Sequence, residues 1–277
     1  MGVRRNIPLK ELRSIGKANR QQVVKSVLAL QFTTLFHRPI SIYFTKLFLM
    51  AGITSDTITL VSYVFAVAAG VLFIFGNYWY ALIGIALYQL FIILDCSDGD
   101  MSRYMYGVNK NPRGGFLEDM GHSIIQPFII ICIAFGVYNN PQSLLVGTLF
   151  HQNLITLVIG FIGSSLFLAL HVLDYYSKSR PAGTVSDEVT AAPVKKHGPI
   201  PYSFAAVSRF RAWANKYTYG DLLLLITVVS NTLWLYLIIW GIIHLPLVIV
   251  NGVISYQRLP KPQVLEQETE PEKQGLS

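Results

Sequence analysis

The sequence predicts an all-α integral membrane protein, in which a cytoplasmic interfacial helix precedes six transmembrane helices. Of the 277 residues, 52% are hydrophobic and only 13% are charged. The apolar residues fall in runs of about twenty, the length that an α-helix needs to cross roughly 30 Å of hydrocarbon. Lysine and arginine lie at the two ends of the chain and in every second connector between these runs. This distribution is typical of polytopic membrane proteins.

Three parts of the chain differ in composition. Residues 1–37 form a basic cytoplasmic segment, 38–258 hold the interfacial helix and the membrane domain, and 259–277 form an acidic tail that we expect to be disordered. No secretory signal and no nucleic-acid-binding motif is recognisable. We therefore attribute the net charge of +7 to membrane topology and anionic lipid headgroups, and expect no nucleic-acid partner.

The first predicted helix of the membrane domain runs from Pro39 to Gly52. Proline suits the first position of a helix, and glycine suits its end. Apolar residues recur along this stretch, which is too short to cross a bilayer. We expect the helix to lie in the cytoplasmic interface.

The six predicted spans cover roughly 57–76, 81–104, 114–138, 150–174, 221–238 and 240–257. The last two are inferred because the apolar stretch from Asp221 to Tyr256 is too long for one crossing. We expect it to form a helical hairpin that turns near Trp240 and Gly241.

An even number of spans places both termini on the same side of the membrane. All 22 Lys and Arg residues lie in segments that this map assigns to that side. The positive-inside rule therefore places both termini, and the loops after the second and fourth spans, in the cytoplasm.

Acidic residues crowd the cytoplasmic end of the second span and the beginning of the third. Five carboxylates and one histidine lie there: Asp95, Asp98, Asp100, Glu118, Asp119 and His122. Asp95 and Asp98 are three residues apart, and Glu118 and His122 are four apart, so each pair shares one helix face. The two faces would together form a compact acidic pocket just inside the membrane.

Ionised carboxylates next to hydrocarbon are costly unless they are paired or coordinated, and no lysine lies near these. Carboxylate oxygens suit Mg²⁺ or Mn²⁺, and two such ions can clamp the attacking and leaving oxygens of a phosphoryl displacement. The sequence thus predicts a site for two divalent cations. The alternative is that the carboxylates only cap two helix ends, but a cap needs one carboxylate and not five.

The first of the two segments resembles the signature of the CDP-alcohol phosphotransferases. That family carries Asp-x-x-Asp-Gly-x-x-Ala-Arg, then a loop, then Gly-x-x-x-Asp-x-x-x-Asp, across the second and third of six transmembrane helices. Here Asp95, Asp98, Gly99 and Arg103 match directly, and Ser102 replaces the alanine. Gly99 and Ser102 also fall on or near one helix face, which leaves a groove poor in side chains where a nucleotide can approach the backbone.

The second segment departs from the family pattern. Gly114 takes the place of the family's glycine, Glu118 that of the third aspartate and His122 that of the fourth. An alternative register makes Asp119 the third acidic position and Ser123 the fourth. We prefer the first register, because it keeps a Phe-Leu pair directly before the carboxylate, as many family members do, and supplies a base.

The resemblance implies a role for each of these residues. Asp95, Asp98 and Glu118 would ligate the metals, with His122 or Asp119 as a further ligand. The residues implied at the nucleotide are Asp56, Thr59, Gly99, Ser102, Arg103 and Gly114. Arg103 would either neutralise phosphate charge or brace the carboxylates.

The resemblance further implies an enzyme that moves a substituted phosphoryl group from a CDP-alcohol to a hydroxyl and releases CMP, in phospholipid or related polyol-phosphate biosynthesis. It also implies a homodimer. His122 would take the proton from the acceptor hydroxyl, or act as a metal ligand only. Two other functions stay open: a catalytically degenerate, lipid-binding or scaffold member, and a cation transporter, which would not explain the Asp-x-x-Asp-Gly spacing.

Overall fold

In the computed structural model, the described residues are 8–10, 12–14, 33–107, 112–140, 149–179, 218–241, 245 and 248–249. The helices are η1 (Thr33–His37), α2 (Arg38–Ala51), α3 (Ser55–Ile74), α4 (Tyr78–Tyr106), α5 (Pro112–Asn139), α6 (Leu154–Ser179) and α8 (Thr218–Val229). A further helical segment covers 233–241. No strand occurs in these residues, which confirms the predicted all-α class.

Among the helices of the described residues, three are long and apolar enough to cross a membrane, namely α3, α4 and the part of α5 over Arg113–Asn139. They coincide with the first three predicted spans and are consistent with an all-α membrane protein. The apolar part of α6 in the described residues, Leu154–Ala169, is shorter. A count of six spans remains a prediction.

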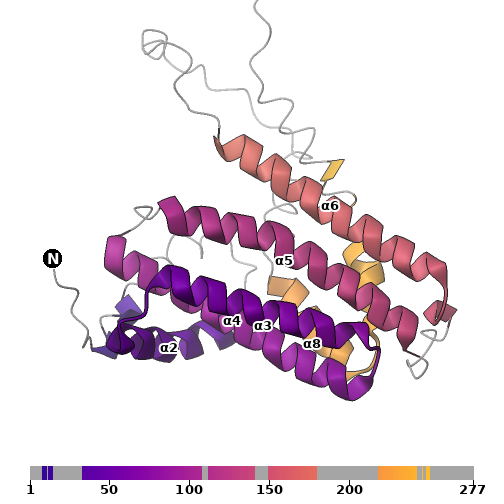
Figure 1. Cartoon of the computed structure of the whole chain (residues 1–277), viewed down its shortest axis with the longest axis horizontal. Helices are drawn as coiled ribbons and strands as arrows, with labels where there is room; N and C mark the ends of the chain where they lie inside the picture. Colours follow the sequence, from indigo (N-terminus) through magenta and orange to yellow (C-terminus); the bar gives the residue numbers. More distant parts are fainter. Residues whose placement is uncertain are drawn as a thin grey trace, which may run out of the picture.

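The helices α3, α4 and α5 form the centre of the bundle. Helix α3 packs against both α4 and α5, α6 lies along α5, and α2 and α8 pack against α4 (Figure 1). Buried side chains such as Phe73, Ile85, Ile129 and Ile133 fill the space between the helices. Gly136 of α5 faces the carbonyl oxygen of Phe73 so closely that a Cβ atom would clash, and this lets α3 and α5 approach each other.

The turn between α3 and α4 is fixed by two residues. Gly76 has a φ of 63°, a conformation that glycine adopts without steric cost. The side-chain oxygen of Asn77 accepts hydrogen bonds from the backbone N–H groups of Trp79 and Tyr80, and so caps α4. This turn makes α3 and α4 antiparallel neighbours.

Helix α2 begins and ends close to where the sequence predicted, with proline in its first turn and Gly52 in the left-handed conformation at its end. Its buried face carries Ser41 and Thr45 as well as Leu49. Ser97 of α4 donates a hydrogen bond to the carbonyl of Ser41, and Thr45 donates to the carbonyl of Ser97. Leu47, by contrast, is exposed. An exposed apolar face suits lipid contact, but the interfacial position of α2 remains a prediction.

Before α2, His37 is fully buried and pairs with Gln89 of α4 through its Nε2 atom. Burial lowers the pKa of His37, because the charged imidazolium loses its hydration there, and the Gln89 contact opposes this only in part. His37 is therefore neutral at pH 7 and helps to fix the start of α2 against the bundle.

The predicted turn of the last hairpin is in the wrong place. Trp240 and Gly241 lie within the helical segment 233–241, and the chain turns at 230–232 instead. Asn231 adopts a φ of 55°, which asparagine tolerates better than most residues, so the polar Ser-Asn-Thr sequence breaks the helix earlier than hydropathy suggested. The predicted acidic tail at 259–277 lies outside the described residues, as does most of the basic segment 1–37.

The segregation of Lys and Arg predicts which positions face the same side of the membrane. In a chain whose Cys96 and Cys132 are replaced by alanine, cysteines placed at Lys195 and Gln263 should react with an impermeant thiol reagent from the cytoplasmic side only. A cysteine at exposed Gln152 should react from the opposite side only. Labelling of Gln152 and Lys195 from the same side would contradict the six-span map.

Candidate functional site

The acidic ends of α4 and α5 meet in the folded chain as the spacing predicted. The Nε2 atom of His122 on α5 lies 3.4 Å from Oδ1 of Asp95 on α4. Asp98, one turn after Asp95, is buried, and the charges of Asp95, Glu118 and His122 all act on it. Two carboxylates of one helix thus face a carboxylate and an imidazole of the next.

Helix α3 donates hydrogen bonds to both helices that carry this cluster. The hydroxyl of Thr59 donates a hydrogen bond of 2.5 Å to Oδ2 of Asp98, and both residues are buried. One turn further along α3, the hydroxyl of Tyr63 donates to the carbonyl oxygen of Leu117, at 2.8 Å. Thr59 therefore orients a carboxylate of α4, while Tyr63 holds the first turns of α5.

The fifth carboxylate, Asp100, belongs to a different contact. Its Oδ1 atom lies 2.6 Å from Arg103 and 3.9 Å from Arg38 of α2. Arg103 therefore braces a carboxylate in this structure, which is one of the two uses considered from the sequence. Asp100 is paired with arginine, so the carboxylates that face one another are Asp95, Asp98 and Glu118.

The small residues of the motif lie next to this arginine. A Cβ atom added to Gly99 would be 3.2 Å from a guanidinium nitrogen of Arg103, so the arginine covers the groove predicted at Gly99 and Ser102. Gly114 is half-buried in the first turn of α5. Asp56 is half-buried in the first turn of α3, where it accepts a hydrogen bond from Ser55.

The two possible registers of the second segment differ in what their residues contact. His122 faces Asp95 across the helix interface, whereas the Ser123 hydroxyl donates a hydrogen bond of 2.7 Å to the carbonyl oxygen of Asp119 on its own helix. Glu118 and Asp119 are both exposed, and the charge of Glu118 acts on His122. The contact across the interface belongs to the register with Glu118 and His122.

The chemistry of this donor set suits a hard cation. Oδ1 of Asp95 is buried and has Nε2 of His122 as a neighbour at 3.4 Å. Among the residues that the structure describes, no group of three or more His, Cys, Asp or Glu side chains is arranged to hold one metal ion. Mg²⁺ commonly takes only one or two carboxylates, with phosphate and water oxygens completing its shell, so pairs from this cluster fit such an ion.

Three residues near the site were not singled out from the sequence. Tyr63 follows Thr59 by one helical turn, so helical spacing alone would have placed it on the same face. Arg38 and Asp221 gave no such signal, because each comes from another helix. Asp221 of α8 is buried and accepts a hydrogen bond of 3.4 Å from the Tyr88 hydroxyl of α4.

A scan against models of known protein families found no match to this chain, and a search of curated proteins found none either.

The Thr59–Asp98 contact predicts a measurable loss of stability. Thr59→Val should lower the free energy of unfolding by about 1–3 kcal/mol, because it leaves a buried carboxylate without its hydroxyl donor. Thr59→Ser keeps the donor and should recover most of that loss. Thermal unfolding of the three purified proteins in the same detergent tests this. Equal stability of the valine variant and the wild type would show that the bond is not made.

Proposed function

We propose that the chain is a membrane-embedded CDP-alcohol phosphotransferase whose active site lies where α4 and α5 meet. The observation that carries the proposal is the contact between Asp95 and His122, which joins the two halves of the motif across a helix interface. A motif that arose by chance would have no reason to bring its acidic positions together. The burial of Asp98 beside them supports the same conclusion.

Two divalent cations, Mg²⁺ or Mn²⁺, belong to this proposal. Asp95, Asp98 and Glu118 would hold them, with the buried Oδ1 of Asp95 as one of the ligand atoms. When bound, the ions would lower the cost of the clustered negative charge and stabilise charge on the transferring phosphoryl group. The phosphates of the donor would supply the oxygen ligands that the protein lacks.

The proposed reaction uses these side chains. The acceptor hydroxyl would lose its proton to the imidazole of His122 as its oxygen attacks the phosphorus that carries the donor alcohol. The bond from that phosphorus to the bridging oxygen breaks, and CMP leaves with the bonding pair. The product is a phosphodiester that joins the two alcohols.

The nucleotide would enter beside Gly99, Ser102 and Gly114, with Asp56 and Thr59 bordering it from α3. The guanidinium of Arg103 covers Gly99 and pairs with Asp100 in this structure. When the donor binds, this guanidinium would leave Asp100 and bind phosphate oxygens of the donor instead. Arg38 also lies beside Asp100 and would keep that carboxylate partly neutralised. Bracing and phosphate binding are then successive uses of one arginine.

The remaining parts of the proposal concern the whole assembly. Six spans, an interfacial α2, cytoplasmic termini and a cytoplasmic active site are consistent with the Lys and Arg distribution. A homodimer in the membrane is part of the same proposal. The donor and acceptor would be substrates of phospholipid or polyol-phosphate synthesis.

Removing one charge from the cluster should abolish turnover. Asp95→Asn and Asp98→Asn should each reduce CMP release from radiolabelled CDP-alcohols to background and weaken Mg²⁺- or Mn²⁺-dependent donor binding, because each loses a charged ligand. A screen of several CDP-alcohols with the wild type comes first. Asp100→Asn is the matched control: its carboxylate pairs with arginine, so the variant should keep metal-dependent binding. Wild-type turnover in both the Asp95 and the Asp98 variant would remove the two-metal proposal.

Substitution of His122 separates its two possible roles. As a base, His122→Ala should lose about 10²–10⁴-fold in turnover while it still binds the CDP donor, and His122→Asp should recover part of the rate. Joint loss of metal affinity and donor binding in His122→Ala would assign it as a ligand only. Full activity of the alanine variant would contradict both roles.

A further inference from the structure

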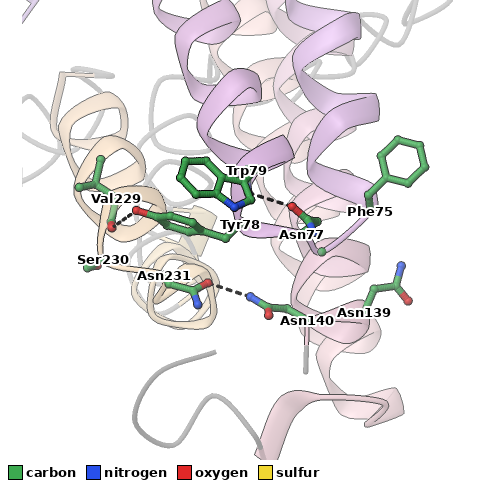
Figure 2. Close-up of a pocket in the computed structure, with 10 residues that line it drawn as sticks. Phe75, Asn77, Tyr78, Trp79, Asn139, Asn140, Val229, Ser230 and Asn231 are labelled. Atoms are coloured by element: carbon green, nitrogen blue, oxygen red, sulfur yellow. Dashed lines mark hydrogen bonds between the residues drawn. The ribbon is translucent and has the colours of Figure 1, made fainter. Parts of the chain in front are cut away.

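A second polar site lies at the other end of the bundle. A pocket of about 570 Å³ is lined by the turn between α3 and α4, the end of α5 and the residues after α8 (Figure 2). Trp79 precedes Asp95 by sixteen positions on α4, so about 24 Å of helix separates the pocket from the acidic cluster. The pocket therefore lies outside the proposed active site, near the opposite surface of the membrane.

The walls of the pocket are held by hydrogen bonds between helices. Asn140 donates a bond of 2.9 Å to the side-chain oxygen of Asn231, and the hydroxyl of Tyr78 donates to the carbonyl oxygen of Val229. Figure 2 shows Asn140 and Asn231 pointing toward one another, with Tyr78 nearby. These bonds join the ends of α4, α5 and α8, so the pocket is formed before any ligand arrives.

Two amide groups on the walls keep unused bonding capacity. Asn139 donates its amide nitrogen to the carbonyl oxygen of Ile74, which leaves its side-chain oxygen as an acceptor. Asn77 uses its side-chain oxygen to cap α4, which leaves its amide N–H groups as donors. The pocket thus offers both a donor and an acceptor to a ligand.

Three aromatic residues also belong to the lining. Phe75, Tyr78 and Trp79 line the pocket, and Trp79 is 70% exposed. No residue that lines the pocket is charged, and the sequence has no Lys or Arg between Lys46 and Arg103. A phosphate or carboxylate would find no counter-charge here, whereas a sugar ring combines hydroxyl groups for the amides with C–H faces for the aromatic rings.

We propose that this pocket binds a neutral polyhydroxyl group, supplied by the headgroup of a glycolipid or by a free sugar, at the membrane surface opposite the acidic cluster. The site is independent of the proposed transferase activity, because none of its residues belongs to the acidic cluster. Its volume accommodates one or two hexose rings, within the roughly 300–1,000 Å³ typical of ligand pockets.

The test compares lipids in nanodiscs that contain the full-length chain. Phosphatidylcholine discs carry equal fractions of monoglucosyl diacylglycerol and phosphatidylglycerol, and native mass spectrometry counts the lipids that the protein retains. The wild type should retain the glucosyl lipid in preference to the anionic one. Methyl β-D-glucoside, added to discs without glycolipid, tests by saturation-transfer NMR whether a free sugar suffices.

Two variants connect any binding to the pocket. Trp79→Ala removes an aromatic wall, and Asn139→Leu removes the free acceptor; each should reduce retained sugar ligand at least fivefold. Tyr80→Ala is the matched control, because Tyr80 is an exposed aromatic residue at the same depth that does not line the pocket. It should bind as the wild type does. All variants are first checked for a single symmetric elution peak and for thermal unfolding close to that of the wild type.

The outcomes are distinct. Preference for the glucosyl lipid, lost in both pocket variants, supports a glycolipid site, and binding of methyl glucoside alone supports a free-sugar site. Absence of both overturns the proposal, as does preference for phosphatidylglycerol. Equal loss in Tyr80→Ala also overturns it, because the aromatic residues would then act only as a general interfacial belt.

Discussion

Three carboxylates held where the ends of two apolar helices meet constrain the arrangement of this molecule. Charges next to hydrocarbon repel one another strongly, because little water is present to screen them. Two contacts within the protein lower the energy of these charges: Thr59 donates a hydrogen bond to Asp98, and His122 lies beside Asp95. In the proposed function, divalent cations would compensate the rest of the negative charge, and this links the fold to the proposed chemistry.

The packing of the bundle serves to hold that cluster in place. Helix α3 contacts both α4 and α5: its Thr59 bonds to α4 and its Tyr63 bonds to α5. At the other end of the bundle, Gly136 lets α5 approach α3 closely, and Asn77 caps α4 beside the α3–α4 turn. The same three helices therefore form two polar ends, one acidic and one built from neutral amides and aromatic rings.

Much of this arrangement could be predicted from the sequence, because it depends on local patterns. Length and hydropathy located α3, α4 and α5 to within a few residues, and spacings of three and four positions placed Asp95 with Asp98 and Glu118 with His122. Contacts between distant segments could not be read in this way. Nothing in the local pattern indicated that Arg38 would share Asp100 with Arg103, or that Asp221 would meet Tyr88. The last hairpin was misplaced because hydropathy does not register the left-handed conformation of Asn231.

Anomalous diffraction from crystals grown with Mn²⁺ and CDP measures directly whether two cations occupy the acidic cluster. Two manganese peaks are expected between α4 and α5, with oxygens of Asp95 and Asp98 about 2 Å from them, as for small divalent ions with oxygen ligands. The diphosphate of CDP is expected beside Gly99, with Arg103 turned away from Asp100. Crystals that contain CDP at the cluster but no manganese, or manganese bound only elsewhere, would rule out the two-cation site.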